Sequence, residues 1–170
     1  MNRSLLVFAG MLACASVMSA QNPMITENKQ NYTSIKNIIL ASAEKMPDDG
    51  YGFQATKEER TWAALMGHIA VAQTGICSSA AGEMKKSNAA TLTDKAALVA
   101  SLKESFAVCD AAWDSTTDEN AHAMVKRGNR EMTRLGVLIY NTTHDNESYG
   151  TMAVYLRLKG IVPPSSEKKK

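Results

Sequence analysis

The sequence of 170 residues lacks several features that mark common protein classes. Beyond its short apolar N-terminal segment it contains no run of about 18 apolar residues, so the mature chain is not expected to span a membrane. The formal net charge is only +2, and the tail Lys168–Lys170 supplies three of the positive charges. Without that tail the charge is near neutral, which gives no indication of nucleic-acid binding.

Several enzyme motifs are also missing. The chain has no H-E-x-x-H metalloprotease motif, no G-x-S-x-G nucleophile elbow, no P-loop and no dinucleotide-binding G-x-G-x-x-G. The sequence contains three histidines, His68, His122 and His144, and these are the first candidates for a site.

The N-terminus has the pattern of an export signal. Arg3 supplies a positive charge, residues 5–13 form an apolar run too short to cross a bilayer, and small residues follow. We expect residues 1–20 to be a signal peptide cleaved near Ala20, and the mature protein to be periplasmic or secreted. An alternative, less favoured, is lipid anchoring at Cys14, because Met11-Leu-Ala-Cys14 weakly resembles a lipobox.

Cleavage near Ala20 would leave two cysteines, Cys77 and Cys109. Their wide separation matches neither a zinc ribbon nor a redox C-x-x-C pair. Two cysteines in an oxidising compartment predict one disulfide, and two buried free thiols are the alternative.

Apolar periodicity predicts four helices and no sustained strand. The first two stripes repeat at spacings of three and four: Tyr32, Ile35, Ile39, Ser42 and Met46, then Trp62, Leu65, Ile69, Ala72 and Ile76. The first helix is expected to end at the turn 46–50. The second is expected to begin with a capping box formed by Thr56 and Glu59.

The third helix is expected from near Thr91 or Thr93, with a buried stripe of Val99, Leu102, Phe106, Cys109 and Trp113. The fourth is expected from about Asn129 to Lys159, ending at Gly160 before Pro163-Pro164. Hydrophobic residues make up 45% of the chain, enough for a core at this length. The predicted fold class is an all-α four-helix bundle over residues 24–166, followed by a basic tail at 167–170.

Two of the histidines have positions suited to a shared site. His68 lies on the flank of the second stripe, and His144 lies in the polar middle of the fourth helix. Ligand sites in bundles form from inward side chains on facing helices, so this pair is the main candidate. A catalytic metal usually has three protein ligands. The residue one turn after His144 is Ser148, a poor ligand.

The chain resembles the DinB-like (YfiT-type) family, most closely its exported branch. The resemblance is carried by Trp62-Ala-Ala-Leu-Met-Gly-His68-Ile-Ala, by His144-Asp-Asn-Glu-Ser-Tyr-Gly150 and by Tyr155-Leu-Arg-Leu-Lys-Gly-Ile-Val-Pro-Pro164, and it extends from about Tyr32 to Ser166. It implies an up-and-down-type four-helix bundle. It also implies a divalent-metal site of three histidines, one from the second helix and two from an H-x-x-x-H pair on the fourth. Some members of the family transfer low-molecular-weight thiols.

Carried over by position, the resemblance assigns His68 and His144 as metal ligands and places the third ligand at Ser148, where this sequence departs from the pattern. Glu147 or water could take the missing position, whereas Asp145 should point away. Zinc, nickel, iron and manganese are the candidate ions. The expected function is an exported metal-dependent hydrolase or transferase with a degraded site, acting on a small molecule.

The alternative is a non-catalytic bundle that has lost the metal and serves as a binding or scaffold protein. The expected partners are a small-molecule substrate and a second copy of the chain in a homodimer.

Overall fold

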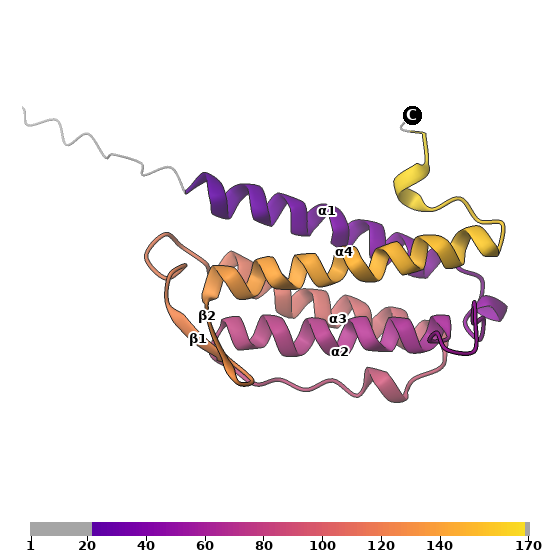
Figure 1. Ribbon diagram of the computed structural model, residues 1–170, viewed down its shortest axis with the longest axis horizontal. Coiled ribbons are helices and arrows are strands. Elements are labelled where there is room, and N and C mark those ends of the chain that lie inside the picture. Colours follow the sequence, from indigo (N-terminus) through magenta and orange to yellow (C-terminus); the bar gives the residue numbers. More distant parts are fainter. Residues whose placement is uncertain (1–21, 169–170) are drawn as a thin grey trace, which may run out of the picture.

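The computed structural model describes residues 22–168. Four long helices form a bundle: α1 (Pro23–Lys45), α2 (Trp62–Ala80), α3 (Lys95–Asp114) and α4 (Arg134–Leu158) (Figure 1). The predicted all-α bundle is therefore confirmed at the level of its four helices. Three short 3₁₀ turns add to them, Asp48–Gly50, Ala89–Thr91 and Pro164–Ser166.

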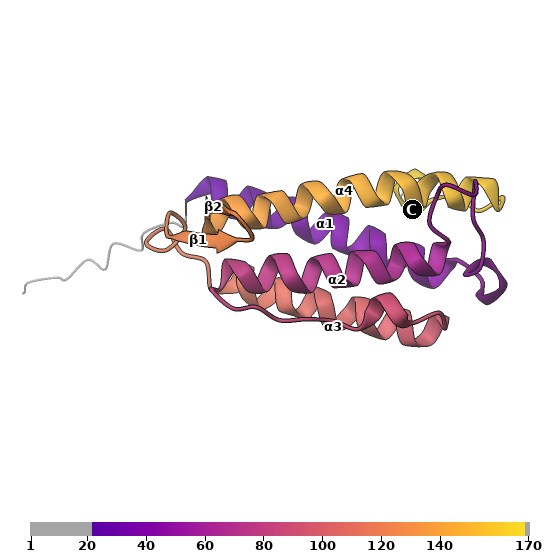
Figure 2. The ribbon, with the colours of Figure 1, turned by 60° about the horizontal axis from the view of Figure 1, so that its bottom comes forward.

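The connections differ from a simple up-and-down bundle. Residues 81–94 run along the length of the bundle before α3 begins, so α2 and α3 point in the same direction (Figures 1 and 2). At the start of α3, Lys95 Nζ donates to the carbonyl of Met46 at the far end, 2.8 Å away. The up-and-down connection implied by the family resemblance is therefore wrong at this point. Residues 81–94 form one long crossover segment between α2 and α3.

A β-hairpin occupies the place where the fourth helix was expected to begin. Strands β1 (Met124–Arg127) and β2 (Arg130–Thr133) pair antiparallel, so Asn129 lies in the turn between them. Gly128, with φ of +61°, allows this two-residue turn, which favours glycine. Each strand has only four residues, too few for visible alternation.

Two helix starts also differ from expectation. The N-cap of α2 is Thr61, whose Oγ1 accepts from the Ala64 N–H at 3.1 Å, so the predicted capping box at Thr56 and Glu59 is wrong. The Trp62 N–H instead donates to the Phe53 carbonyl at 2.8 Å, because the loop before α2 folds back on the helix start.

The start of α3 shifts for a similar reason. Asp94 caps α3 by accepting from the Ala97 N–H at 2.9 Å, so the helix begins after both Thr91 and Thr93. Thr91 instead belongs to the 3₁₀ turn Ala89–Thr91.

The predicted apolar stripes form the core. Every member of the α1 stripe is buried, and in α3 only Val99 is partly exposed. Tyr32 of α1 stacks on Trp113 of α3 with ring centroids 5.8 Å apart. Burial of such side chains contributes about 1.5–3 kcal/mol each, so these stripes account for much of the stability of the bundle.

The predicted disulfide is present. Cys77 of α2 and Cys109 of α3 are both fully buried and bonded, with Cα atoms 4.9 Å apart. The bond joins the two parallel helices near their C-terminal ends. No helix in residues 22–168 is long and apolar enough to cross a membrane. The expected signal peptide, Cys14 and the last two lysines lie outside the described residues.

Candidate functional site

His68 of α2 and His144 of α4 meet between the two helices. Their Nε2 atoms are 3.1 Å apart, and their ring centroids are separated by 5.1 Å. Both rings are partly buried. The third histidine, His122, is exposed in the loop after α3 and takes no part. The predicted pairing of His68 with His144 across the bundle is therefore confirmed.

The surroundings keep both rings uncharged. Burial lowers the pKa of His68, and the nearby Arg60 lowers it further, while Glu147 acts in the opposite direction. Burial also lowers the pKa of His144, and the adjacent His68 ring adds to this effect. At neutral pH the two rings are neutral, so one donates an N–H to the lone pair of the other.

One nitrogen of the pair has no partner. His144 Nδ1 is buried and makes no hydrogen bond within the described part of the chain. A proton on this atom would lack an acceptor, which costs free energy. The favoured tautomer therefore carries its proton on Nε2 of His144 and donates it to Nε2 of His68.

The position expected for a third ligand holds Ser148. This serine is buried, one turn after His144, and its hydroxyl has no hydrogen-bond partner in residues 22–168. Glu147 is exposed and influences both histidines electrostatically. However, among residues 22–168 no group of three or more His, Cys, Asp or Glu side chains could hold a metal ion. The chain thus offers two imidazole ligands and no third one in this geometry.

A buried polar network lies beside the histidine pair, where α4 packs against α2. Asp145 is fully buried, and its Oδ2 accepts from Gln73 Nε2 at 2.9 Å and from Asn141 Nδ2 at 3.0 Å. Asn141 Nδ2 also donates to Gln73 Oε1 at 2.6 Å. Burial raises the pKa of Asp145 to about 8, against the opposing effect of the two hydrogen bonds. Within residues 22–168, Asp145 bonds to Gln73 and Asn141 and makes no hydrogen bond to either histidine.

This network positions the histidines. Asp145 follows His144 directly, so the bond to Gln73 fixes how α4 is rotated against α2. Gln73 Oε1 also lies 2.7 Å from Cys109 Sγ, which connects the network to the disulfide. Sequence reasoning missed the network, although Asn141 and Asp145 at i, i+4 in a core helix were its signal.

Positive side chains flank the histidine pair. The guanidinium of Arg127 on β1 lies 4.1 Å from the centroid of the Tyr140 ring, one turn before His144. Arg60 lies in the loop before α2 and, like Arg127, acts on His144 electrostatically. Neither guanidinium has an ion-pair partner within residues 22–168. The two arginines, one before α2 and one on β1, therefore leave a positive charge near the pair that no carboxylate within residues 22–168 pairs with.

In a comparison with protein families, residues 33–152 match the model of the DinB superfamily. No curated protein sequence matches the chain.

Crystal structures of two DinB-like proteins are similar in fold. One, from Bacillus cereus ATCC 10987, has a TM-score of 0.72 at 17% identity, covering 82% of this chain and 95% of its own. The other, from Bacillus subtilis, has a TM-score of 0.66 at 21% identity, covering 87% of this chain and 100% of its own. A histidine-to-alanine mutant of the mycothiol-dependent maleylpyruvate isomerase has a TM-score of 0.61 at 18% identity, covering 78% of this chain and 66% of its own.

Proposed function

Because the chain belongs to the DinB superfamily, we propose that it is an exported protein whose His68 and His144 bind a divalent metal ion for hydrolysis or group transfer. The observation that carries this proposal is the 3.1 Å separation of the two Nε2 atoms on facing helices. Both nitrogens can reach one ion, since metal–nitrogen bonds of about 2.0–2.1 Å are usual for zinc. Zinc, nickel, iron and manganese all accept imidazole ligands.

The site is proposed to be weak, because Ser148 stands where a third ligand would be needed. Water or the substrate itself would complete the coordination. A bound ion would supply Lewis acidity and lower the pKa of a coordinated water or thiol. The chain's own part is to hold two neutral imidazoles at a fixed separation, using the Gln73–Asp145 hydrogen bond behind them.

The flanking charges favour a substrate with a negative group. Arg60, in the loop before α2, and Arg127, on β1, both act electrostatically on His144 and lack carboxylate partners in residues 22–168. A thiolate or carboxylate would be attracted there, in competition with Glu147. A mycothiol-dependent isomerase among the structural neighbours supports a small thiol as one candidate of this class.

A non-catalytic bundle is the second candidate, favoured by one specific observation. A metal-bound His144 Nε2 requires the proton on Nδ1, and that atom is buried without an acceptor in the described part of the chain. Metal-ligating histidines almost always donate this second N–H to a partner. In this alternative the two rings only hydrogen-bond to each other, and the protein binds or organises a partner without metal.

Metal titration by calorimetry separates the two candidates. We expect wild-type protein without an affinity tag to bind Zn²⁺ or Ni²⁺ weakly and His68→Ala to abolish binding. Ser148→His should tighten binding at least about tenfold, or about 1.4 kcal/mol, because residue 148 is on the same face as His144.

Other outcomes distinguish the alternatives. If wild type binds metal tightly and Glu147→Ala loses that binding, Glu147 moves in as the third ligand. Absence of binding in both wild type and Ser148→His would favour the non-catalytic bundle.

A further inference from the structure

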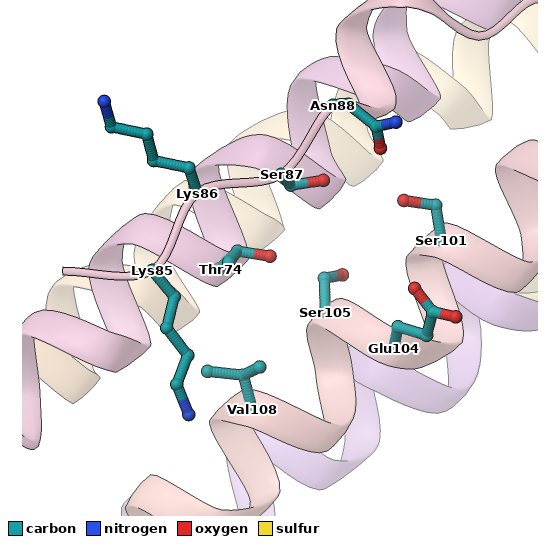
Figure 3. Close-up of a pocket in the computed structure, with 9 residues that line it drawn as sticks. All are labelled: Thr74, Lys85, Lys86, Ser87, Asn88, Ser101, Glu104, Ser105 and Val108. Atoms are coloured by element: carbon teal, nitrogen blue, oxygen red, sulfur yellow. The ribbon is translucent and has the colours of Figure 1, made fainter. Parts of the chain in front are cut away.

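A cavity lies on a different face of α2 from the histidine pair. It is formed by α2, α3 and the crossover segment at residues 85–88, and its volume is about 630 Å³ (Figure 3). Thr74 lines it six residues after His68, a rotation of about 240° around the helix. Small-molecule sites typically have volumes of about 300–1,000 Å³, so this cavity has a suitable size.

The floor of the cavity presents hydrogen-bond acceptors. Thr74 and Ser105 are buried, and the hydroxyl group of each donates its proton to a backbone carbonyl of its own helix. Thr74 Oγ1 donates to the Ala70 carbonyl at 2.9 Å, and Ser105 Oγ donates to the Leu102 carbonyl at 2.8 Å. A hydroxyl has one proton and two lone pairs, so both residues can only accept from a ligand.

The rim offers both donors and acceptors. Figure 3 shows the side chains of Ser87, Ser101 and Glu104 directed toward the same space from the crossover segment and α3. The side chains of Asn88, Ser101 and Glu104 have no hydrogen-bond or ion-pair partner within residues 22–168. The rim therefore has unused hydroxyl and amide donors as well as a free carboxylate.

The two lysines of the crossover segment contribute little positive charge to the interior. Their ammonium groups point away from the space that the hydroxyls face (Figure 3). Lys85 Nζ is also paired with Glu83 at 3.0 Å. The cavity lining is thus mixed: apolar surface that includes Val108 lies between the hydroxyls, and the exposed carboxylate of Glu104 is the charged group that faces the space.

The walls of the cavity are held in place without a ligand. The Cys77–Cys109 disulfide fixes the spacing of α2 and α3 next to Val108, which lines the cavity. The crossover segment is tied to α2 because the Lys85 N–H donates to Ser78 Oγ at 3.1 Å. A preformed site lowers the entropic cost of binding.

We propose that this cavity binds a small polyhydroxylated molecule of the sugar or polyol class. Each hydroxyl of such a ligand both donates and accepts, which matches an accepting floor and a mixed rim. An ammonium ligand would satisfy only the acceptors, and an anion would satisfy only the donors. The site is separate from the histidine pair and does not depend on metal.

The test is calorimetric titration of the full mature protein with glucose and with maltose. Putrescine and inorganic phosphate serve as an amine and an anion probe. We expect saturable binding of at least one sugar in the millimolar range or tighter. Ser101→Leu should weaken it at least about tenfold by filling the cavity. Glu104→Gln, at an exposed position where folding is not at risk, should weaken it several-fold.

Two control variants separate this site from others. Ser34→Leu, at an exposed serine of α1, and His68→Ala should bind the sugar like wild type. The proposal is overturned if neither sugar binds, if Ser101→Leu and Glu104→Gln bind as tightly as wild type, or if only putrescine or phosphate binds. Loss of sugar binding in His68→Ala would also overturn it, because the sugar would then occupy the histidine site.

Discussion

Gly67 marks a close approach between α2 and the crossover segment. A Cβ at this position would lie 2.6 Å from the carbonyl oxygen of Ala89, a backbone atom that cannot easily move. The absence of a side chain is therefore what lets residues 89–91 pack directly on α2. Gly75 lies on the same helix, and a Cβ there would meet nothing within 4 Å.

These two glycines make a matched pair for a stability test. We expect Gly67→Ala to lower the free energy of unfolding by about 1–3 kcal/mol through overpacking. Gly75→Ala should raise it by about 0.5–1 kcal/mol, because alanine favours the helix over glycine. Urea unfolding followed by circular dichroism measures both. Equal effects at the two positions would contradict the close contact at Ala89.

Asp145 should make stability depend on pH. Its pKa is raised to about 8 in the folded protein, from 3.8 for an unperturbed group, because it is buried. The folded state therefore keeps a proton that the unfolded state loses. The contribution of Asp145 to the free energy of unfolding is therefore fully present below about pH 4. It falls by about 1.4 kcal/mol per pH unit as the pH rises toward 8.

Comparison with Asp145→Asn isolates this effect, since asparagine does not titrate. The stability of wild type relative to Asp145→Asn should fall by a few kcal/mol between pH 5 and pH 8, measured by urea unfolding. Asp49→Asn, at an exposed position, should show no such trend relative to wild type. A flat difference between wild type and Asp145→Asn would mean that Asp145 is charged in the folded core.

At the scale of elements, the disulfide links two parallel helices that the crossover segment joins in sequence. Cys77 and Cys109 close a loop of 32 residues, which contains the whole crossover. Loop-closure entropy predicts a contribution of about 3–4 kcal/mol to the free energy of unfolding. Replacing both cysteines with alanine, or reducing the wild type, should lose most of this amount.

Two measurements check the bond. Denatured, unreduced protein from its own host should contain no alkylatable thiol at Cys77 or Cys109. A reductant should lower the denaturation midpoint of wild type and leave the midpoint of the double alanine variant unchanged. Two free thiols in the unreduced protein would exclude the disulfide.

The elements also show where local patterns stop being informative. The stripes of α1 and α3 were readable because they repeat over several turns. The hairpin was not, since each of its strands has four residues and its turn depends on Gly128. The start of α2 was misplaced because Thr56 has the right spacing to Glu59, whereas the backbone amide of Trp62 is bound by Phe53.

At the scale of the whole molecule, the export prediction determines which residues the mature protein contains. The order of Arg3, the apolar run at 5–13 and the small residues that follow predicts removal of about twenty residues. Mass spectrometry of the protein from its own host should find a mature chain beginning near Gln21. The disulfide is compatible with this, because such bonds persist in oxidising compartments.

Leu6→Arg provides the control for export, because a charge in the apolar run should leave the chain unprocessed in the cytoplasm. A lipid mass on Cys14 would select the lipoprotein alternative. An intact Met1 on wild-type protein in the cytosolic fraction would contradict export altogether.

The sequence by itself determined which residues face the core, because helical periodicity is a property of neighbouring residues along one chain. It also determined the candidate cysteines and the pair His68 and His144, together with the resemblance to the DinB-like family. Only the tertiary structure decided that the two ring nitrogens lie 3.1 Å apart, that Gln73 and Asn141 hold Asp145 in the core, and that α2 and α3 run parallel. Such distances depend on how helices are offset and rotated against each other. That arrangement results from packing over the whole bundle, which no local spacing encodes.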